Sequence, residues 1–146
     1  MYHYTECGLS RVWLANGYKA FKTPYGKSVA IERADELHRA IALSLANHKP
    51  RLSGGEFRFI RKELGLSQAA LASVLGNDAQ SIARWEKGGR IPRMAERFVR
   101  ALYREHAEGN ARIGELIERI GQLDARPETR LVFEETGGAW EPKKAA

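Results

Sequence analysis

The sequence has a single cysteine, Cys7, and no long run of apolar residues. One cysteine cannot form a disulfide within the chain, which fits a reducing cytoplasm. No apolar run approaches the roughly 20 residues that a membrane-spanning helix needs. The N-terminus, MYHYTECGLSR, lacks the basic stretch followed by an apolar one that marks a secretory signal. These absences predict a cytoplasmic protein that does not enter a membrane.

Metal ligands and catalytic groupings are also scarce. His3 and Cys7 are four residues apart, but a structural zinc ion needs four ligands in a tetrahedron. The other histidines, His38, His48 and His106, have no ligand spacing. The glutamates near the C-terminus have no nucleophile or metal ligand beside them in the sequence. We therefore expect no bound metal, no cofactor and no enzymatic activity.

Positive charge is in excess, with 24 Lys and Arg against 18 Asp and Glu and a net charge of +6. The excess lies in the first two thirds of the chain: residues 1–52 and 53–106 each carry +4, whereas residues 107–146 carry −2. Apolar residues make up 43% of the chain, which is enough to form a packed core. This balance favours a folded protein with a polyanionic partner, nucleic acid first and an acidic protein second.

Residues 1–32 have the composition of short strands and turns. Asn16-Gly17 is a strong hairpin dipeptide because both residues tolerate positive φ, so residues 11–15 are predicted to pair with residues 19–23. TPYGKS predicts a second turn and SVAI a third strand. The many aromatic residues of this region are expected to form the core of a tiny module; alternatively, they form an exposed patch for a partner.

Helical spacing of apolar residues begins at Arg33 and predicts a helix over residues 33–48. The segment KPRLSGG then has the composition of a linker. Short helices follow, with Ser67 as an N-cap and Gly65 as a C-cap. Their sequences are GEFRFIRKELG, QAALASVLG, a third from about Asp78 to Lys87, MAERFVRALYREH with Phe98, Leu102 and Tyr103 as apolar positions, and NARIGELIERIGQL.

The predicted fold class is α+β. A small strand-rich N-terminal module with one helix is assigned to residues 1–50. An all-α domain of five helices, including a C-terminal helix, is assigned to residues 51–125. Residues 126–146 form a tail that either holds one hairpin or is loose.

The stretch from Gln68 to Gly88 has the spacing of two helices that cross steeply through a tight turn. Ala72 allows close approach, Gly76 takes the left-handed turn conformation, and Leu71, Ile82 and Trp85 fill the wedge between the helices. The outward positions of the second helix are Ala79, Gln80, Ala83 and Arg84. Gln80 and Arg84 lie on one face, one turn apart. Such a helix fits the DNA major groove, where arginine can pair with guanine and glutamine with adenine.

The segment LGLSQAALASVLGNDAQSIARWEKGGRIP resembles the Xre (phage-repressor) helix-turn-helix family, and the resemblance covers about residues 54–104. It implies that Gln80, Arg84 and Ala79 face base edges, with Ala79 limited to a thymine methyl. It implies phosphate contacts from Gln68, at the start of the preceding helix, from Ser81, and from Lys87, Arg90 and Arg93, which follow the recognition helix. It further implies a structural ion pair between Arg61 and Glu86.

The order of a strand-rich module, a linker and this domain resembles the MqsA (YgiT-type) antitoxin family. In that family the N-terminal module binds zinc through two Cys-x-x-Cys pairs and contacts a ribonuclease toxin. This sequence keeps only Cys7, which removes the metal site and weakens the inference of a toxin partner.

The function predicted from the sequence is a sequence-specific regulator, a dimeric repressor of its own operon on palindromic double-stranded DNA. The alternative is an antitoxin that silences a toxin and autoregulates. The expected homodimer interface lies on the helix NARIGELIERIGQL, whose apolar stripe could equally pack back onto its own subunit. The interface residues proposed there are Ile113, Leu116, Ile117 and Ile120.

Overall fold

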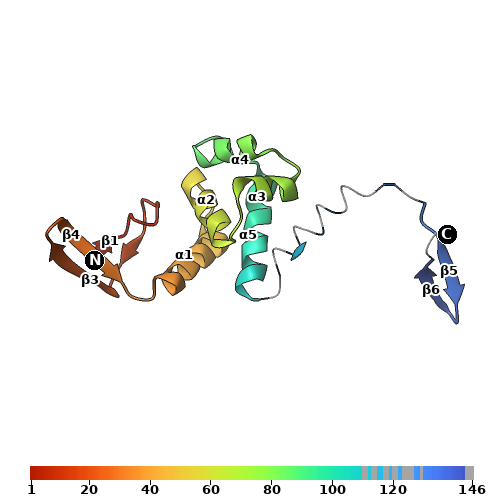
Figure 1. Ribbon diagram of the computed structural model, residues 1–146, viewed down its shortest axis with the longest axis horizontal. Coiled ribbons are helices and arrows are strands. Elements are labelled where there is room, and N and C mark those ends of the chain that lie inside the picture. The colour runs from red at the N-terminus through yellow and green to blue at the C-terminus, as the bar shows by residue number, and fades with distance from the viewer. Residues whose placement is uncertain are drawn as a thin grey trace.

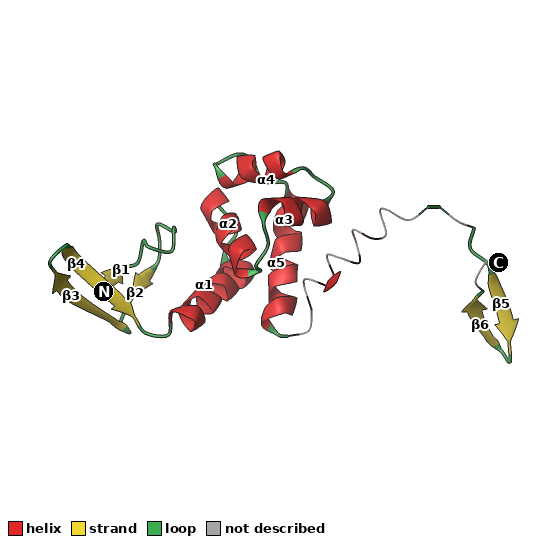
Figure 2. Cartoon of the chain, in the orientation of Figure 1, coloured by secondary structure: helices red, strands yellow, loops and turns green. Residues whose placement is uncertain are grey.

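The computed structural model describes residues 1–109, 112, 115–116, 119, 122, 127–128 and 130–143. Along the described part of the chain, four strands come first, five helices follow them, and two more strands lie near the C-terminus (Figures 1 and 2). The helices are α1 (Ala34–His48), α2 (Gly54–Glu63), α3 (Gln68–Leu75), α4 (Ala79–Glu86) and α5 (Arg93–Ala107). The strands are β1 (Tyr2–His3), β2 (Trp13–Leu14), β3 (Tyr18–Thr23), β4 (Gly26–Ile31), β5 (Phe133–Thr136) and β6 (Ala139–Pro142).

The N-terminal strands pair differently from the prediction at Asn16-Gly17. β2 pairs with β1, and β3 pairs with β4, each antiparallel in its own two-stranded sheet. The β3–β4 turn lies at TPYG, where the hydroxyl of Thr23 donates to the carbonyl of Gly26 at 2.8 Å. The hairpin predicted across Asn16-Gly17 is therefore wrong. Gly17 has the expected positive φ of 77°, but a turn dipeptide does not determine which strands pair.

The aromatic residues of this module divide between the core and the surface. Tyr4 is buried and its hydroxyl lies 2.7 Å from Nε2 of His38 on α1. Trp13, Phe21 and Tyr25 are exposed, Tyr25 almost completely at 99%. The expected aromatic core thus forms only in part, and a partner-binding role for the exposed aromatic residues stays a prediction.

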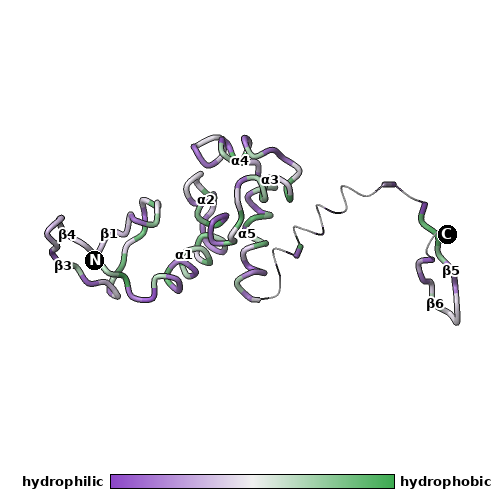
Figure 3. Tube along the Cα trace, in the orientation of Figure 1, coloured by the Kyte–Doolittle hydropathy of each residue, from purple (hydrophilic) through white to green (hydrophobic). Residues whose placement is uncertain are grey.

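The helical core is shared by all five helices. α1 packs on α2 and α5, and its Ile41, Ala42 and Ala46 are buried in the same cluster as Phe57 and Val99. Both hydrophobic and hydrophilic residues occur along α1 and α5, as expected for amphipathic helices (Figure 3). The predicted layout is thus only partly correct, because the helix grouped with the N-terminal module belongs to the helical core. The boundary placed after residue 50 separates two helices that pack together.

The segment between α1 and α2 is held in place by Glu96 of α5. The Glu96 carboxylate accepts the backbone N–H of Leu52 at 2.9 Å and pairs with Arg100 at 2.7 Å and Arg51 at 3.2 Å. Burial alone would raise the pKa of Glu96, but the hydrogen bonds from Arg100 and Leu52 and the charge of Arg51 hold it below its ordinary value. The segment predicted to be a linker is therefore anchored to the core.

The C-terminal part matches the hairpin alternative. β5 and β6 pair antiparallel, and every residue of both strands is exposed.

Of the four residues proposed for the dimer interface, Ile113, Ile117 and Ile120 lie outside the described residues, and Leu116 is exposed. Within the described part of the chain, every helix is too short or too polar to cross a membrane.

Candidate nucleic-acid interface

The turn between α3 and α4 is fixed by local hydrogen bonds. The hydroxyl of Ser67 accepts the N–H of Ala70 at 3.0 Å and caps α3. α3 ends at Gly76, whose φ is 72°, and the N–H of Asn77 donates to the carbonyl of Ala72 at 2.9 Å. This arrangement satisfies a carbonyl in the last turn of α3, and three residues separate α3 from α4.

Asp78 begins the second helix of the motif. Its carboxylate accepts the N–H of Ser81 at 2.7 Å. This hydrogen bond from the Ser81 backbone lowers the pKa of Asp78, so the cap is charged at neutral pH. α4 therefore starts directly after the turn, at the predicted position.

A buried wedge sets the angle between α3 and α4. Leu71 and Ile82 are fully buried, and Ala72 and Trp85 nearly so. The ring of Trp85 meets Phe57 of α2 edge-on, with centroids 6.0 Å apart and planes at 88°. The side of α4 that carries Ile82 and Trp85 is thus committed to the core, as predicted from the sequence.

The opposite side of α4 faces solvent. Gln80 and Arg84 are exposed, while Ala79 and Ser81 are half-buried. Arg84 makes one weak contact, from Nη2 to the Ser81 hydroxyl at 3.4 Å. Figure 1 shows α4 at the outer edge of the helical group, beyond α2 and α3. No described part of the chain covers the face that carries Gln80 and Arg84.

A buried ion pair supports α4 from beneath. Arg61 of α2 donates to Glu86 through Nε at 2.7 Å and Nη2 at 2.9 Å, and its Nη1 donates to the carbonyl of Leu66 at 2.8 Å. The side chains of Arg61 and Glu86 are 8% and 3% exposed. Gln68 donates its amide to Glu86 at 3.1 Å. The amide of Gln68 is thus engaged within the motif, and its phosphate contact stays a prediction.

Basic side chains gather where α4 leads into α5. Lys87, Arg90 and Arg93, all predicted to contact phosphates, are exposed. Arg90 and Arg93 line a recess of about 550 Å³ together with Arg51. Sequence analysis missed Arg51 because it lies in the segment assigned as a linker, 40 residues from its hydrogen-bond acceptor, the carbonyl of Ile91. The only sequence feature that could have indicated Arg51 is its positive charge in the basic part of the chain.

Comparison with known proteins adds an independent observation. A model of the helix-turn-helix family matches residues 57–96. An uncharacterized HTH-type transcriptional regulator of Methanothermobacter thermautotrophicus is 50% identical over 50 residues, which cover 33% of this chain and 72% of that protein. The chain belongs to the helix-turn-helix family. No solved structure matches it.

Membership of the helix-turn-helix family agrees with the arrangement of α3 and α4, because the matched residues include both helices. The family match and the relative support a DNA-binding regulator of transcription. Among the described residues, no three His, Cys, Asp or Glu side chains lie close enough to hold a metal ion.

Proposed function

We propose that this helix-turn-helix protein is a sequence-specific transcriptional regulator that inserts α4 into the major groove of DNA. One observation carries the proposal: Gln80 and Arg84 are exposed one turn apart on a helix whose other side is buried. Arginine can bond bidentately to guanine and glutamine to adenine in the major groove. Ala79, at the start of α4, is suited to contact a thymine methyl group.

The basic residues after α4 are assigned to the phosphate backbone. Lys87, Arg90 and Arg93 follow the reading helix directly in sequence and are exposed. Phosphate contacts supply sequence-independent affinity and fix the register of the protein on the duplex. Ser81 and Gln68 are proposed to add contacts at the starts of α4 and α3, where helix N-termini favour anions.

The regulator is proposed to act as a homodimer that represses its own operon. One reading helix specifies too few base pairs, and paired half-sites about one helical turn apart overcome this limit. The segment of residues 110–123 is the proposed interface. Family membership points to a role in DNA binding rather than in catalysis.

The direct test is selection of binding sites from a pool of random duplexes, followed by measurement of the Arg84→Ala variant. We expect a palindromic consensus, and we expect Arg84→Ala to weaken binding by about 1–3 kcal/mol at one base pair per half-site and relax the preference there. Binding to all single-base variants of the site is measured by fluorescence anisotropy. Unchanged selectivity in Arg84→Ala would remove Arg84 from the proposed reading face.

Arg93→Ala is expected to behave differently. It should weaken binding to selected and random duplexes alike and reduce the salt slope by about 1, because one counterion fewer is released. The measurement is the dissociation constant at several salt concentrations for both duplexes. A loss confined to the selected sequence would instead assign Arg93 to base recognition.

A role as an antitoxin is the second candidate, and one observation favours it. Trp13, Phe21 and Tyr25 are exposed on the N-terminal module, although aromatic residues usually gather in cores or interfaces. Purification of the chain at its natural expression level, followed by mass spectrometry of stoichiometric partners, tests this role. A ribonuclease-like partner released by mutation of Phe21 and Tyr25 supports it, and a partner-free homodimer contradicts it.

A further inference from the structure

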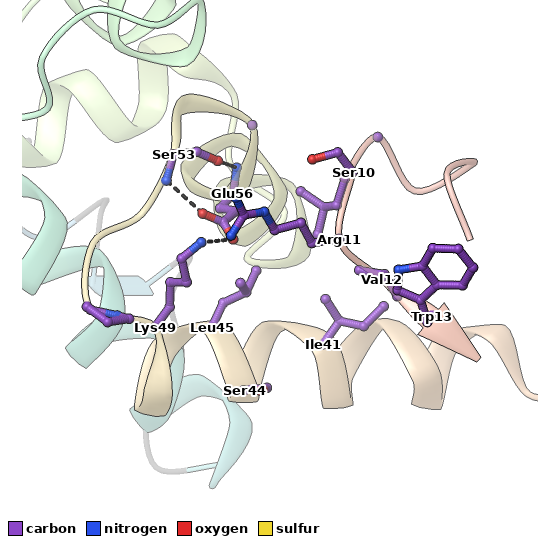
Figure 4. A pocket seen from close by; sticks show the side chains of 14 residues that line it. Ser10, Arg11, Val12, Trp13, Ile41, Ser44, Leu45, Lys49, Ser53 and Glu56 are labelled. Carbon is purple, nitrogen blue, oxygen red and sulfur yellow. Dashed lines mark hydrogen bonds and ion pairs between the residues drawn. The ribbon is translucent and has the colours of Figure 1, made fainter. Parts of the chain in front are cut away.

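A pocket of about 990 Å³ lies between the loop of residues 8–13, α1 and the start of α2 (Figure 4). Its apolar lining comes from the loop and from α1, chiefly Leu9, Val12, Trp13, Ile41 and Leu45. The volume is at the upper end of the range for small-molecule sites, which are mostly apolar with a few polar groups. None of the residues assigned to DNA contacts lines it. The pocket is therefore a second site, separate from the reading face.

The charged residues of this pocket leave one positive charge unmatched. Lys49 pairs with Oε2 of Glu56 at 3.1 Å, and Oε1 of Glu56 accepts the N–H of Ser53 at 2.8 Å. These bonds occupy both oxygens of Glu56. Arg11 lines the pocket and forms no ion pair or hydrogen bond with any described residue. Its side chain extends from the loop toward the α2 side of the pocket (Figure 4). The lining thus offers one guanidinium to a ligand with one negative charge.

The start of α2 connects the pocket with the reading helix. Gly55 lines the pocket, and a Cβ atom there would lie 3.8 Å from the carbonyl oxygen of Gly8 in the loop. At Gly54, a Cβ atom would lie 2.5 Å from the carbonyl oxygen of Trp85, at the end of α4. Two successive residues of α2 therefore approach the pocket wall and the reading helix. A ligand that displaces the loop from α2 acts on the same turn that supports α4.

We propose that this pocket binds a small effector that joins one carboxylate to an apolar body of one or two rings. The carboxylate pairs with Arg11, because a guanidinium matches a carboxylate bidentately. The rings pack against Ile41, Leu45 and the face of the pocket formed by Trp13. The regulatory part of the proposal rests on the proposed function: the bound effector shifts α2 against α4 and lowers the affinity for DNA.

The test uses 1-naphthoate as the probe and the full chain as the protein. Isothermal titration is expected to give a Kd below about 1 mM. Arg11→Gln is expected to bind 1-naphthoate about tenfold more weakly than the unmodified protein does. The neutral 1-naphthamide should bind the unmodified protein with a similarly reduced affinity, because it lacks the carboxylate. Ser44→Trp, which fills the pocket from an exposed position on α1, should abolish binding. Lys22→Gln is the matched control, since it removes one exposed positive charge on β3, outside the pocket lining, and should leave binding unchanged.

Thermal melts show that each variant is folded before titration. Absence of binding, or equal binding by the unmodified protein and Arg11→Gln, would overturn the assignment of the site. Saturating 1-naphthoate is further expected to weaken binding to the selected duplex about fivefold or more. Binding of the probe without a change in DNA affinity would overturn the effector role. A protein that binds no DNA in the absence of the probe would instead refute the proposed function and leave the titration result intact.

Discussion

Glu86→Ala is expected to lower the free energy of unfolding by about 3–5 kcal/mol, because it leaves the guanidinium of Arg61 buried without its carboxylate. Arg61 makes two hydrogen bonds to Glu86, and both side chains are almost fully buried. Gln68 loses its acceptor in the same change. Loss of one charge from a buried pair costs far more than the intact pair contributes, because the remaining charge is desolvated without compensation.

Urea unfolding, followed by far-UV circular dichroism, measures this loss. Glu36→Ala is the control, because Glu36 forms an ion pair with Arg33 in which both side chains are exposed to solvent. Exposed pairs contribute about 0–1 kcal/mol, so this variant should stay close to the parent protein. Arg61→Ala and the double variant complete a thermodynamic cycle. A similar small loss for Glu86→Ala and Glu36→Ala would show that the pair of Arg61 and Glu86 does not stabilise the motif.

The helix-turn-helix motif could be predicted from the sequence because its determinants are local. Ser67 and Asp78 cap the helices that follow them, and Gly76 has the positive φ that the turn requires. The apolar spacing placed Leu71, Ile82 and Trp85 in the core, where they lie. Each of these features depends on neighbours within about one helical turn, which the sequence displays directly.

The parts that could not be predicted depend on distant partners. Glu96 binds Leu52 across 44 positions, and Arg100 reaches the carbonyl of Leu45 across 55. No local pattern encodes such contacts, so the anchored segment was assigned as a linker. The error at Asn16-Gly17 has the same cause, because the partner of Trp13 and Leu14 is at the N-terminus. Likewise, the apolar positions assigned on α5 included Phe98, which is 36% exposed, and omitted Val99, which is fully buried.

Phe57→Ala is the second large effect that we expect, with a loss of about 3–5 kcal/mol in the free energy of unfolding. Phe57 is fully buried on α2 and meets Trp85 edge-on, so its removal leaves a cavity under α4. The lost burial and the cavity both contribute, because the close-packed surroundings collapse only in part. Since Trp85 holds α4 to the core, DNA affinity should also fall in this variant under conditions where it is still folded.

Phe98→Ala removes the same atoms from a partly exposed position on α5, and it should cost less, about 1–2 kcal/mol, because about a third of Phe98 stays in water in the folded protein. Urea unfolding of both variants separates cavity formation from the chemistry of the side chain. Equal losses would mean that the wedge between α2 and α4 is not close-packed. A large loss confined to Phe57→Ala, together with weakened DNA binding, would show that the core beneath Trp85 holds Gln80 and Arg84 in the position from which they read DNA.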